Sequence, residues 1–172
     1  AISSRHFFGI DEILIYQFYK RNKNKYKRVA DIGCNCGIHT KILCELGYLV
    51  DSYEPDTKHA NFAKEYINSH PNNNFIQKAV SNYSGKATFT RLNDNSTGSY
   101  INDKKDGYGN MEKYEVDVID ANELSNNYDL IKMDIEGSEV DVLSAFDPSM
   151  YEKTDIIAEV STEKNRLLLW DL

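Results

Sequence analysis

The sequence predicts one α/β domain in which a mostly parallel central sheet is covered by helices on both faces. Short apolar stretches alternate with helical stretches, as in successive βαβ units. A glycine-containing loop directly follows the first apolar stretch. The chain has 172 residues, of which 41% are hydrophobic and 27% charged, and this suits one globular domain. We divide it into an N-terminal helical extension, residues 1–27, and a core, residues 28–160, without an internal repeat or a second domain.

The elements expected in the first half follow from periodicity and capping. Residues 9–20 are predicted to form an amphipathic helix, because apolar residues recur near helical spacing. Its apolar side would consist of Ile10, Ile13, Leu14 and Phe18. Gly47 is the expected C-terminal cap of a helix over residues 38–46, and Asp56 the N-cap of a helix over residues 57–69. Strands are expected at residues 28–33, 49–53 and 75–80.

The second half should hold strands at residues 86–91, 114–119, 128–134 and 154–160, and helices at 138–146 and 163–170. Between the first two of these strands lies a polar segment, residues 93–110. It is too long for an idle connection. We expect a lid or acceptor-binding loop there, with Ser96, Ser99 and Tyr100 as substrate contacts.

Charge and cysteine usage exclude several classes of protein. The net charge of −7 opposes attraction to nucleic acid, and the basic stretch at residues 20–28 is best explained as a solvated helix end. No apolar run is long enough to span a membrane, and residues 1–8 lack a signal-peptide pattern. Cys34, Cys36 and Cys44 are an odd count that indicates reduced thiols. Cys34 and Cys36 make an incomplete zinc set even with His39. We expect a cytoplasmic protein with no nucleic-acid partner and assign no metal.

The most informative motif is Asp-Ile-Gly-Cys-Asn-Cys-Gly at residues 31–37, after a strand and before a helix. Glycines allow a ligand to come close, and ligands of such sheets bind at the carboxyl ends of the strands. Glu54 ends the next strand, 21 residues after Gly33. A carboxylate there can accept hydrogen bonds from both hydroxyls of a ribose. The pair predicts a cofactor that contains a nucleoside.

The spacing of the loop indicates which cofactor. A dinucleotide-binding loop needs Gly-x-Gly-x-x-Gly, whereas here Gly33, Asn35 and Gly37 alternate. Asp31 would repel a pyrophosphate but suits the cationic methionine part of S-adenosylmethionine. The loop with Glu54 resembles motifs I and II of class I methyltransferases.

A third motif, Leu-Ile-Lys-Met-Asp-Ile-Glu-Gly-Ser-Glu at residues 130–139, takes an apolar strand straight into three carboxylates. Charged groups at the carboxyl end of a strand face the ligand crevice. Glu139 is equally well explained as a favourable charge at a helix N-terminus. That explanation does not extend to Lys132 and Asp134.

Together these motifs resemble the FkbM family of O-methyltransferases over residues 29–160. The segments that carry the resemblance are residues 35–37, 53–56, 79–85, 132–143 and 156–159. The resemblance implies a Rossmann-like class I methyltransferase fold and methyl transfer to a hydroxyl, typically of a sugar, glycolipid or secondary metabolite. It implies cofactor-binding roles for Asp31, Gly33, Cys34, Asn35, Gly37, Glu54, Pro55, Ala79, Val80 and Ser81. It implies a reaction site formed by Lys132, Asp134, Glu136 and Glu159.

A hydroxyl is a weak nucleophile and needs a general base. Asp134 is our first candidate and Glu136 the second, with Lys132 orienting a carboxylate or the acceptor. A cation held by Asp134, Glu136 and Glu159 is an alternative. An NAD(P)-dependent oxidoreductase and a non-catalytic binding module are alternatives for the whole chain.

One departure from the class I pattern concerns the end of the sheet. Class I methyltransferases usually add an antiparallel strand pair after the fifth strand, but only about a dozen residues follow Val160. That pair is either absent or replaced by the strands around Lys86 and Tyr114.

Overall fold

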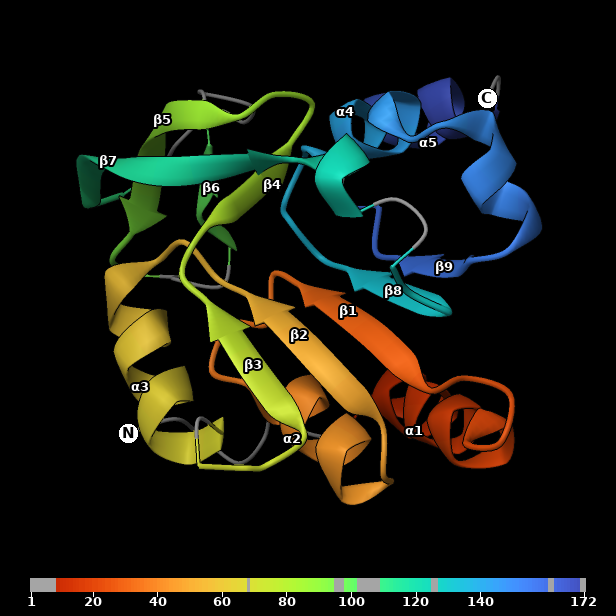
Figure 1. Ribbon diagram of the computed structural model, residues 1–172. Helices are drawn as coiled ribbons and strands as arrows, with labels where there is room; N and C mark the ends of the chain where they lie inside the picture. Colours follow the sequence, from red (N-terminus) through yellow and green to blue (C-terminus); the bar gives the residue numbers. More distant parts are fainter. Residues whose placement is uncertain are drawn as a thin grey trace.

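The computed structural model describes residues 9–67, 69–94, 98–101, 109–124, 127–160 and 163–170. Ser96 lies outside these ranges. The helices are α1 (Ile10–Asn22), α2 (Ile38–Glu45), α3 (Thr57–Ile67), α4 (Glu139–Ala145) and α5 (Glu163–Trp170), with 3₁₀ turns η3 (Ala121–Leu124) and η4 (Pro148–Glu152). The strands are β1 (Arg28–Ile32), β2 (Leu49–Tyr53), β3 (Asn73–Ile76), β4 (Ala79–Ser81), β5 (Gly85–Leu92), β6 (Tyr100–Ile101), β7 (Met111–Asp120), β8 (Leu130–Met133) and β9 (Asp155–Ala158) (Figure 1).

The larger sheet is wholly parallel and has the strand order β3-β2-β1-β8-β9. β1 is its central strand, and Asp31 lies opposite Ser52 on one side and Lys132 on the other. Ligand-binding loops therefore leave β1, β2 and β8 at the same edge. This confirms the predicted fold class.

Alternating side chains of the parallel strands fill two separate cores. Val29 packs towards α1 and α2 with Tyr19, Leu43 and Tyr48, all fully or nearly fully buried. Ala30 and Ile32 point the other way. They pack with side chains of η3, β8, α4 and η4: Ala121, Ile131, Val142 and Met150. In Figure 1, α1, α2 and α3 lie on one side of the sheet and α4 and α5 on the other. Burying one large aliphatic side chain contributes roughly 1.5–3 kcal/mol, so both faces stabilise the sheet.

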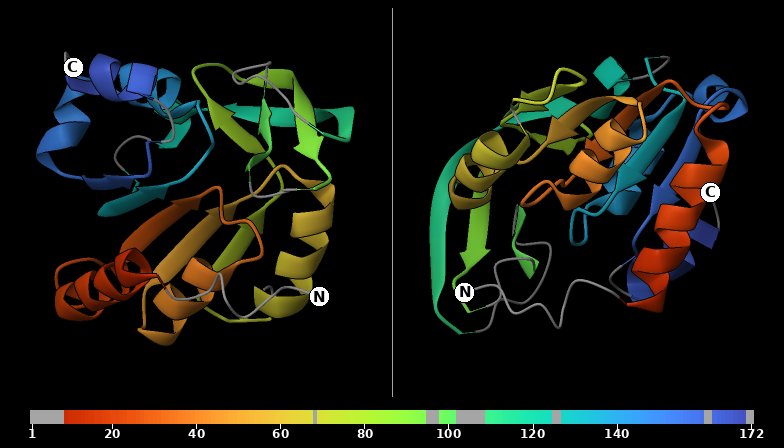
Figure 2. Two further views of the ribbon diagram at one scale, coloured as in Figure 1. Left: turned by 180° about the vertical axis from the view of Figure 1, so that it is seen from behind. Right: turned by 90° about the horizontal axis from the view of Figure 1, so that it is seen from below.

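A second sheet has the strand order β4-β7-β5-β6, with β5 and β7 antiparallel and β4 parallel to β7. Its own core contains Ala87, Phe89, Ile101, Val116 and Val118. The two views of Figure 2 place this sheet next to the carboxyl edge of the larger one. The predicted pairing of strands around Lys86 and Tyr114 is present, as Lys86 opposite Asp117 and Phe89 opposite Tyr114. It forms a separate sheet, and within the described residues β9 pairs with β8 alone.

Two predictions for individual elements were wrong. Residues 75–80 are not one strand, because β3 ends at Ile76 and pairs with β2, whereas β4 begins at Ala79 and pairs with β7. The N–H of Lys78 bonds to the carbonyl of Ile76 at 2.9 Å in the turn between them. The apolar pattern of residues 75–80 is continuous, so it does not indicate that the chain passes from the larger sheet to the second one.

Three of the four residues of the apolar stripe predicted for α1 do not face the core, whereas Phe18 packs against the cluster around Tyr19 and Tyr26. Ile10 is 78% exposed and Leu14 63% exposed, and Ile13 is also exposed. The helix is held instead by buried Tyr19, whose carbonyl accepts a hydrogen bond from Tyr48 Oη at 2.6 Å. Glu12 adds a polar contact with His39, 3.0 Å between Oε2 and Nε2. Of the helices in the described ranges, none has the length and apolar character needed to cross a membrane.

Candidate functional site

The loop after β1 is shaped by left-handed residues and by close backbone contacts. Gly33 has a φ of 76°, and a Cβ there would lie 1.9 Å from the carbonyl oxygen of Asp134. Only glycine fits this approach between the loop and the end of β8. The N–H groups of Gly33 and Cys34 both donate to the carbonyl of Tyr53, at 2.9 and 3.0 Å. The loop is thus fastened to the ends of both neighbouring strands.

Glu54 closes the loop from the side of β2. Its Oε2 accepts the N–H of Asn35 at 2.9 Å, and its Oε1 accepts the N–H of Asp56 at 2.7 Å. The side chain is 5% exposed. Burial raises the pKa of Glu54 to about 7, although the two backbone hydrogen bonds oppose the shift. Each carboxylate oxygen can accept a further hydrogen bond, so the group remains able to bind hydroxyls.

Asp31 lies beneath the loop that follows β1 and is not exposed at the loop's surface. It is fully buried, and its Oδ2 accepts a hydrogen bond from Thr40 Oγ1 at 2.6 Å. Its Oδ1 lies 3.4 Å from Lys132 Nζ but has no hydrogen-bond partner of good geometry among the described residues.

Lys132 is a buried cation surrounded by acceptors. Its Nζ lies 3.4 Å from the carbonyl of Gly33, 3.4 Å from Asp31 and 3.9 Å from Asp134 Oδ2. Burial lowers the pKa of Lys132, but the charges of Asp31 and Asp134 outweigh it and raise the pKa overall. A lysine that stays protonated cannot act as a base, so its contacts fit the orienting role expected from the sequence.

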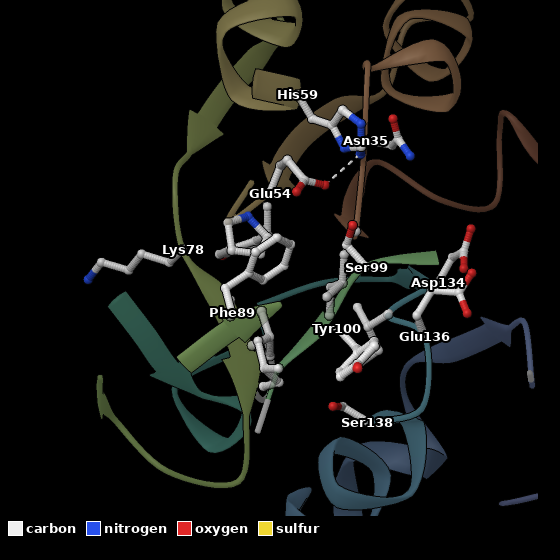
Figure 3. A pocket seen from close by; sticks show the side chains of 18 residues that line it. Asn35, Glu54, His59, Lys78, Phe89, Ser99, Tyr100, Asp134, Glu136 and Ser138 are labelled. Carbon is white, nitrogen blue, oxygen red and sulfur yellow. Dashed lines mark hydrogen bonds between the residues drawn. The ribbon is translucent and has the colours of Figure 1, made fainter. Parts of the chain in front are cut away.

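A cavity that opens to solvent lies where the two sheets meet. In Figure 3, Glu54 and His59 lie at one end, Asp134 and Glu136 along one side, and Ser138 at the opposite end. The predicted site residues that line it are Gly33, Asn35, Glu54, Pro55, Ala79, Val80, Ser99, Tyr100, Asp134 and Glu136. The predicted residues that are not among its lining residues are Asp31, Cys34, Gly37, Ser81, Lys132 and Glu159.

The structure shows where the predicted site residues that do not line the cavity are located. Gly37 begins α2 with a φ of 84°, and a Cβ there would lie 2.8 Å from Ile67 Cδ1. Ser81 is buried at the end of β4, and Glu159 is exposed after β9. Cys34 is buried, and burial raises the pKa of its thiol well above the usual value. In the described residues, no three His, Cys, Asp or Glu side chains are grouped closely enough to hold a metal ion. Asp134, Glu136 and Glu159 therefore do not form the cation site considered from the sequence.

Eight of the lining residues were not predicted as site residues, among them His59, Phe89 and Ser138. His59 lies on the first turn of α3, near Glu54, and burial lowers its pKa. Phe89 comes from β5, whose strand pattern carries no sign of a ligand. Ser138 lies within the third motif, between Gly137 and Glu139, and that position was the one available indication.

A family model described as the Methyltransferase FkbM domain matches residues 15–170. A solved structure, methyltransferase FkbM from Methylobacillus flagellatus KT, superposes with a TM-score of 0.57 at 16% identity, over 84% of this chain and 36% of that one. The StiE O-MT structure gives a TM-score of 0.44 at 16% identity, over 83% and 41% of the two chains. The plantazolicin methyltransferase BpumL in complex with SAH gives 0.40 at 13% identity, over 91% and 53%. The first of these likenesses supports the fold, and the chain spans about a third of that structure's length. The comparison with curated proteins finds no match.

Proposed function

The chain belongs to the FkbM methyltransferase family, and on that premise we propose that it transfers a methyl group from S-adenosylmethionine to a hydroxyl of a sugar, glycolipid or secondary metabolite. One observation carries the proposal. The cavity combines the left-handed loop residues Gly33 and Asn35 with the carboxylate of Glu54 at one end and places Asp134 and Glu136 along its side. The first group suits a nucleoside, and the second suits an acceptor that must lose a proton.

The residues present fit this cofactor. Glu54 can accept hydrogen bonds from both ribose hydroxyls, because its two oxygens are fixed by backbone N–H groups and still have accepting capacity. The apolar surface for the adenine base of the cofactor comes from Pro55, Val80 and Ile135. Asp31 offsets the charge of Lys132, and the carboxylate of Asp134 leaves negative charge beside the loop, where a cationic methionine part would lie. When bound, S-adenosylmethionine supplies a methyl group already activated for transfer.

The chain's own contribution is orientation and removal of a proton. Positioning of two reactants can lower a barrier by roughly 7–11 kcal/mol. Asp134 is partly exposed to the cavity and held 3.9 Å from Lys132, so we assign it as the base that accepts the hydroxyl proton. Glu136, on the same wall, is the second candidate. Lys132 acts through Asp134 and Gly33 as an orienting cation.

The proposal is tested by calorimetric titration with S-adenosylmethionine and S-adenosylhomocysteine. The parent chain, Asp31→Ala and Glu54→Ala are compared, with Glu115→Ala on the exposed face of β7 as a matched control. Micromolar binding that is weakened by both site variants and kept by the control is the expected result. No binding to a folded parent chain would reject the proposal.

Two alternatives are decided by related measurements. Tight binding of NADH, followed by its fluorescence, would favour an oxidoreductase. Binding of S-adenosylmethionine without transfer to any of a panel of methyl glycosides, glycolipids and polyhydroxylated metabolites would favour a binding module. Labelled methyl transfer to one member of that panel would identify the acceptor class.

A further inference from the structure

The turn after β8 has a left-handed backbone at two successive residues. Glu136 has a φ of 54° and Gly137 a φ of 108°. This region of φ is unfavourable for a residue that carries a Cβ, so Glu136 keeps it only where surrounding contacts over-determine the turn. The contacts that do so can be named.

Both backbone polar groups of Gly137 are bound by buried side chains. Its N–H donates to the two carboxylate oxygens of Glu139, at 2.9 and 3.1 Å, and its carbonyl accepts Asn165 Nδ2 at 3.1 Å. Asn165 Nδ2 also donates to Glu139 Oε2 at 3.0 Å. Glu139 is 0% exposed and Asn165 8% exposed, so water competes poorly for these bonds.

The turn carries two groups that line the cavity, Glu136 and Ser138. Ser138 Oγ is buried and has no hydrogen-bond partner among the described residues, although it lies at the cavity end seen in Figure 3. Asn165, in contrast, belongs to α5, and none of the described lining residues comes from that helix. A helix distant from the cavity is thus bonded to the backbone between two of its lining residues.

We propose that Asn165 and Glu139 are positioning residues that hold residues 136–138 in the shape that directs Glu136 and Ser138 into the cavity. Glu139 supplies the acceptor for the Gly137 amide, and Asn165 supplies the donor for its carbonyl and fixes Glu139 in place. Neither side chain lines the cavity. The inference rests on the proposed function only in taking that cavity as the ligand site.

The chain offers a matched set of variants. Asn165→Ala removes the donor, and Glu139→Gln replaces one of the two acceptor oxygens with an N–H₂ group, which faces a donor at either position. The double variant Glu139→Gln with Asn165→Asp restores a donor–acceptor pair between the two side chains and keeps one negative charge, but the Gly137 carbonyl loses its donor. Arg166→Ala is the control, because it removes only an exposed ion pair with Glu163 on the same helix.

The first readout is amide hydrogen exchange at Gly137, measured by NMR on the full chain without ligand. A partly buried amide bonded to a buried carboxylate should exchange slowly. We expect Asn165→Ala and Glu139→Gln to speed this exchange about tenfold or more while amides of β1 stay protected. The double variant should recover part of the protection, and Arg166→Ala should match the parent chain.

The second readout is the affinity for S-adenosylhomocysteine. A ligand that must itself order a left-handed turn should bind about tenfold more weakly to Asn165→Ala and Glu139→Gln. Faster exchange at Gly137 with weaker binding, partly restored in the double variant, supports the proposal. If Asn165→Ala does not fold, the comparison of Glu139→Gln with the double variant carries the test.

Unchanged exchange at Gly137 in folded Asn165→Ala and Glu139→Gln would overturn the proposal, as would faster exchange with unchanged affinity. If the parent chain binds neither cofactor, the proposed function fails, whereas exchange at Gly137 still decides whether the two side chains hold the turn.

Discussion

Arg91 and Asp56 form a buried, bidentate ion pair that joins the second sheet to the end of β2. Arg91 Nε lies 2.7 Å from Asp56 Oδ2, and Nη2 lies 2.9 Å from Oδ1, with both side chains at most 3% exposed. Asp56 also caps α3, and its N–H donates to Glu54. The carboxylate that faces the cavity is therefore fixed indirectly by an arginine from the other sheet.

Arg91→Met should destabilise the protein by about 3–5 kcal/mol, because it leaves the buried Asp56 charge without its partner. The free energy of unfolding in urea measures this effect. Arg166→Ala removes an ion pair with both side chains at least 60% exposed and should change that free energy by no more than about 0.5 kcal/mol. Equal, small losses in the two variants would contradict the role of the Arg91–Asp56 pair.

Cofactor affinity should fall in acid because Glu54 has a pKa of about 7. The protonated carboxyl accepts hydroxyl hydrogen bonds less well, so the Kd for S-adenosylhomocysteine should rise about tenfold for each pH unit below about 7 and be constant above it. Calorimetry over that range measures the slope. Glu54→Gln should bind weakly at every pH, and His59→Asn should keep the slope, since the pKa of His59 is lowered.

The raised pKa of Glu54 also predicts how stability changes with pH. The folded protein binds a proton more readily than the unfolded chain, whose carboxyl has the ordinary value of 4.5. This group's contribution to stability is therefore greatest below about pH 4.5 and decreases as pH rises through about 7. Urea unfolding of the parent chain and of Glu54→Gln across this window isolates the contribution. A difference between them that does not vary with pH would be evidence against a shifted Glu54.

Gly33→Ala should be far more damaging than Gly47→Ala, although both glycines have positive φ. A Cβ at Gly33 would overlap the carbonyl of Asp134, whereas nothing lies within 4 Å of one at Gly47. We expect a loss above about 3 kcal/mol for Gly33→Ala and about 1 kcal/mol for Gly47→Ala. Urea unfolding of the two variants gives both values, and similar losses would mean that backbone strain alone matters.

Asp134→Asn should lower turnover far more than it weakens cofactor binding. Loss of a general base typically costs about 100- to 10,000-fold in rate, and the ribose contacts of Glu54 would remain. The measurement compares methyl transfer to an acceptor from the panel with the Kd for S-adenosylhomocysteine. Glu136→Gln is the matched variant on the same wall. A larger rate loss in Glu136→Gln would assign the base to Glu136.

Much of the larger sheet was predictable because short sequence patterns identify its strands and helices. β1, β2 and α5 were found within a residue, since apolar runs and helical spacing mark buried parallel strands and helices. Gly33 and Glu54 were found as cavity residues because the carboxyl ends of adjacent parallel strands must meet.

What the sequence concealed depends on contacts between distant segments. Nothing local separates β3 from β4, since the break follows from pairing with β2 and β7. The exposed face of α1 was mistaken for its buried one because Tyr19, not the aliphatic stripe, makes the contact with Tyr48. Asp31 and Lys132 neutralise each other beneath the loop, and only their register on adjacent strands brings them together. Phe89 lines the cavity from the second sheet, and no sequence pattern predicts where that sheet lies relative to the larger one.

The position of β1 between β2 and β8 has a consequence for the order of folding. β1 meets β2 after one short helix, but Val29 and Leu130 are about 100 residues apart along the chain when they pair. The whole second sheet is made in that interval from a continuous stretch, β4 to β7. Loop closure over so long a stretch is entropically costly until the intervening residues are compact. We therefore expect the antiparallel pairing of β5 with β7 to form early and the β1–β8 pairing, which completes the cavity, to limit the folding rate.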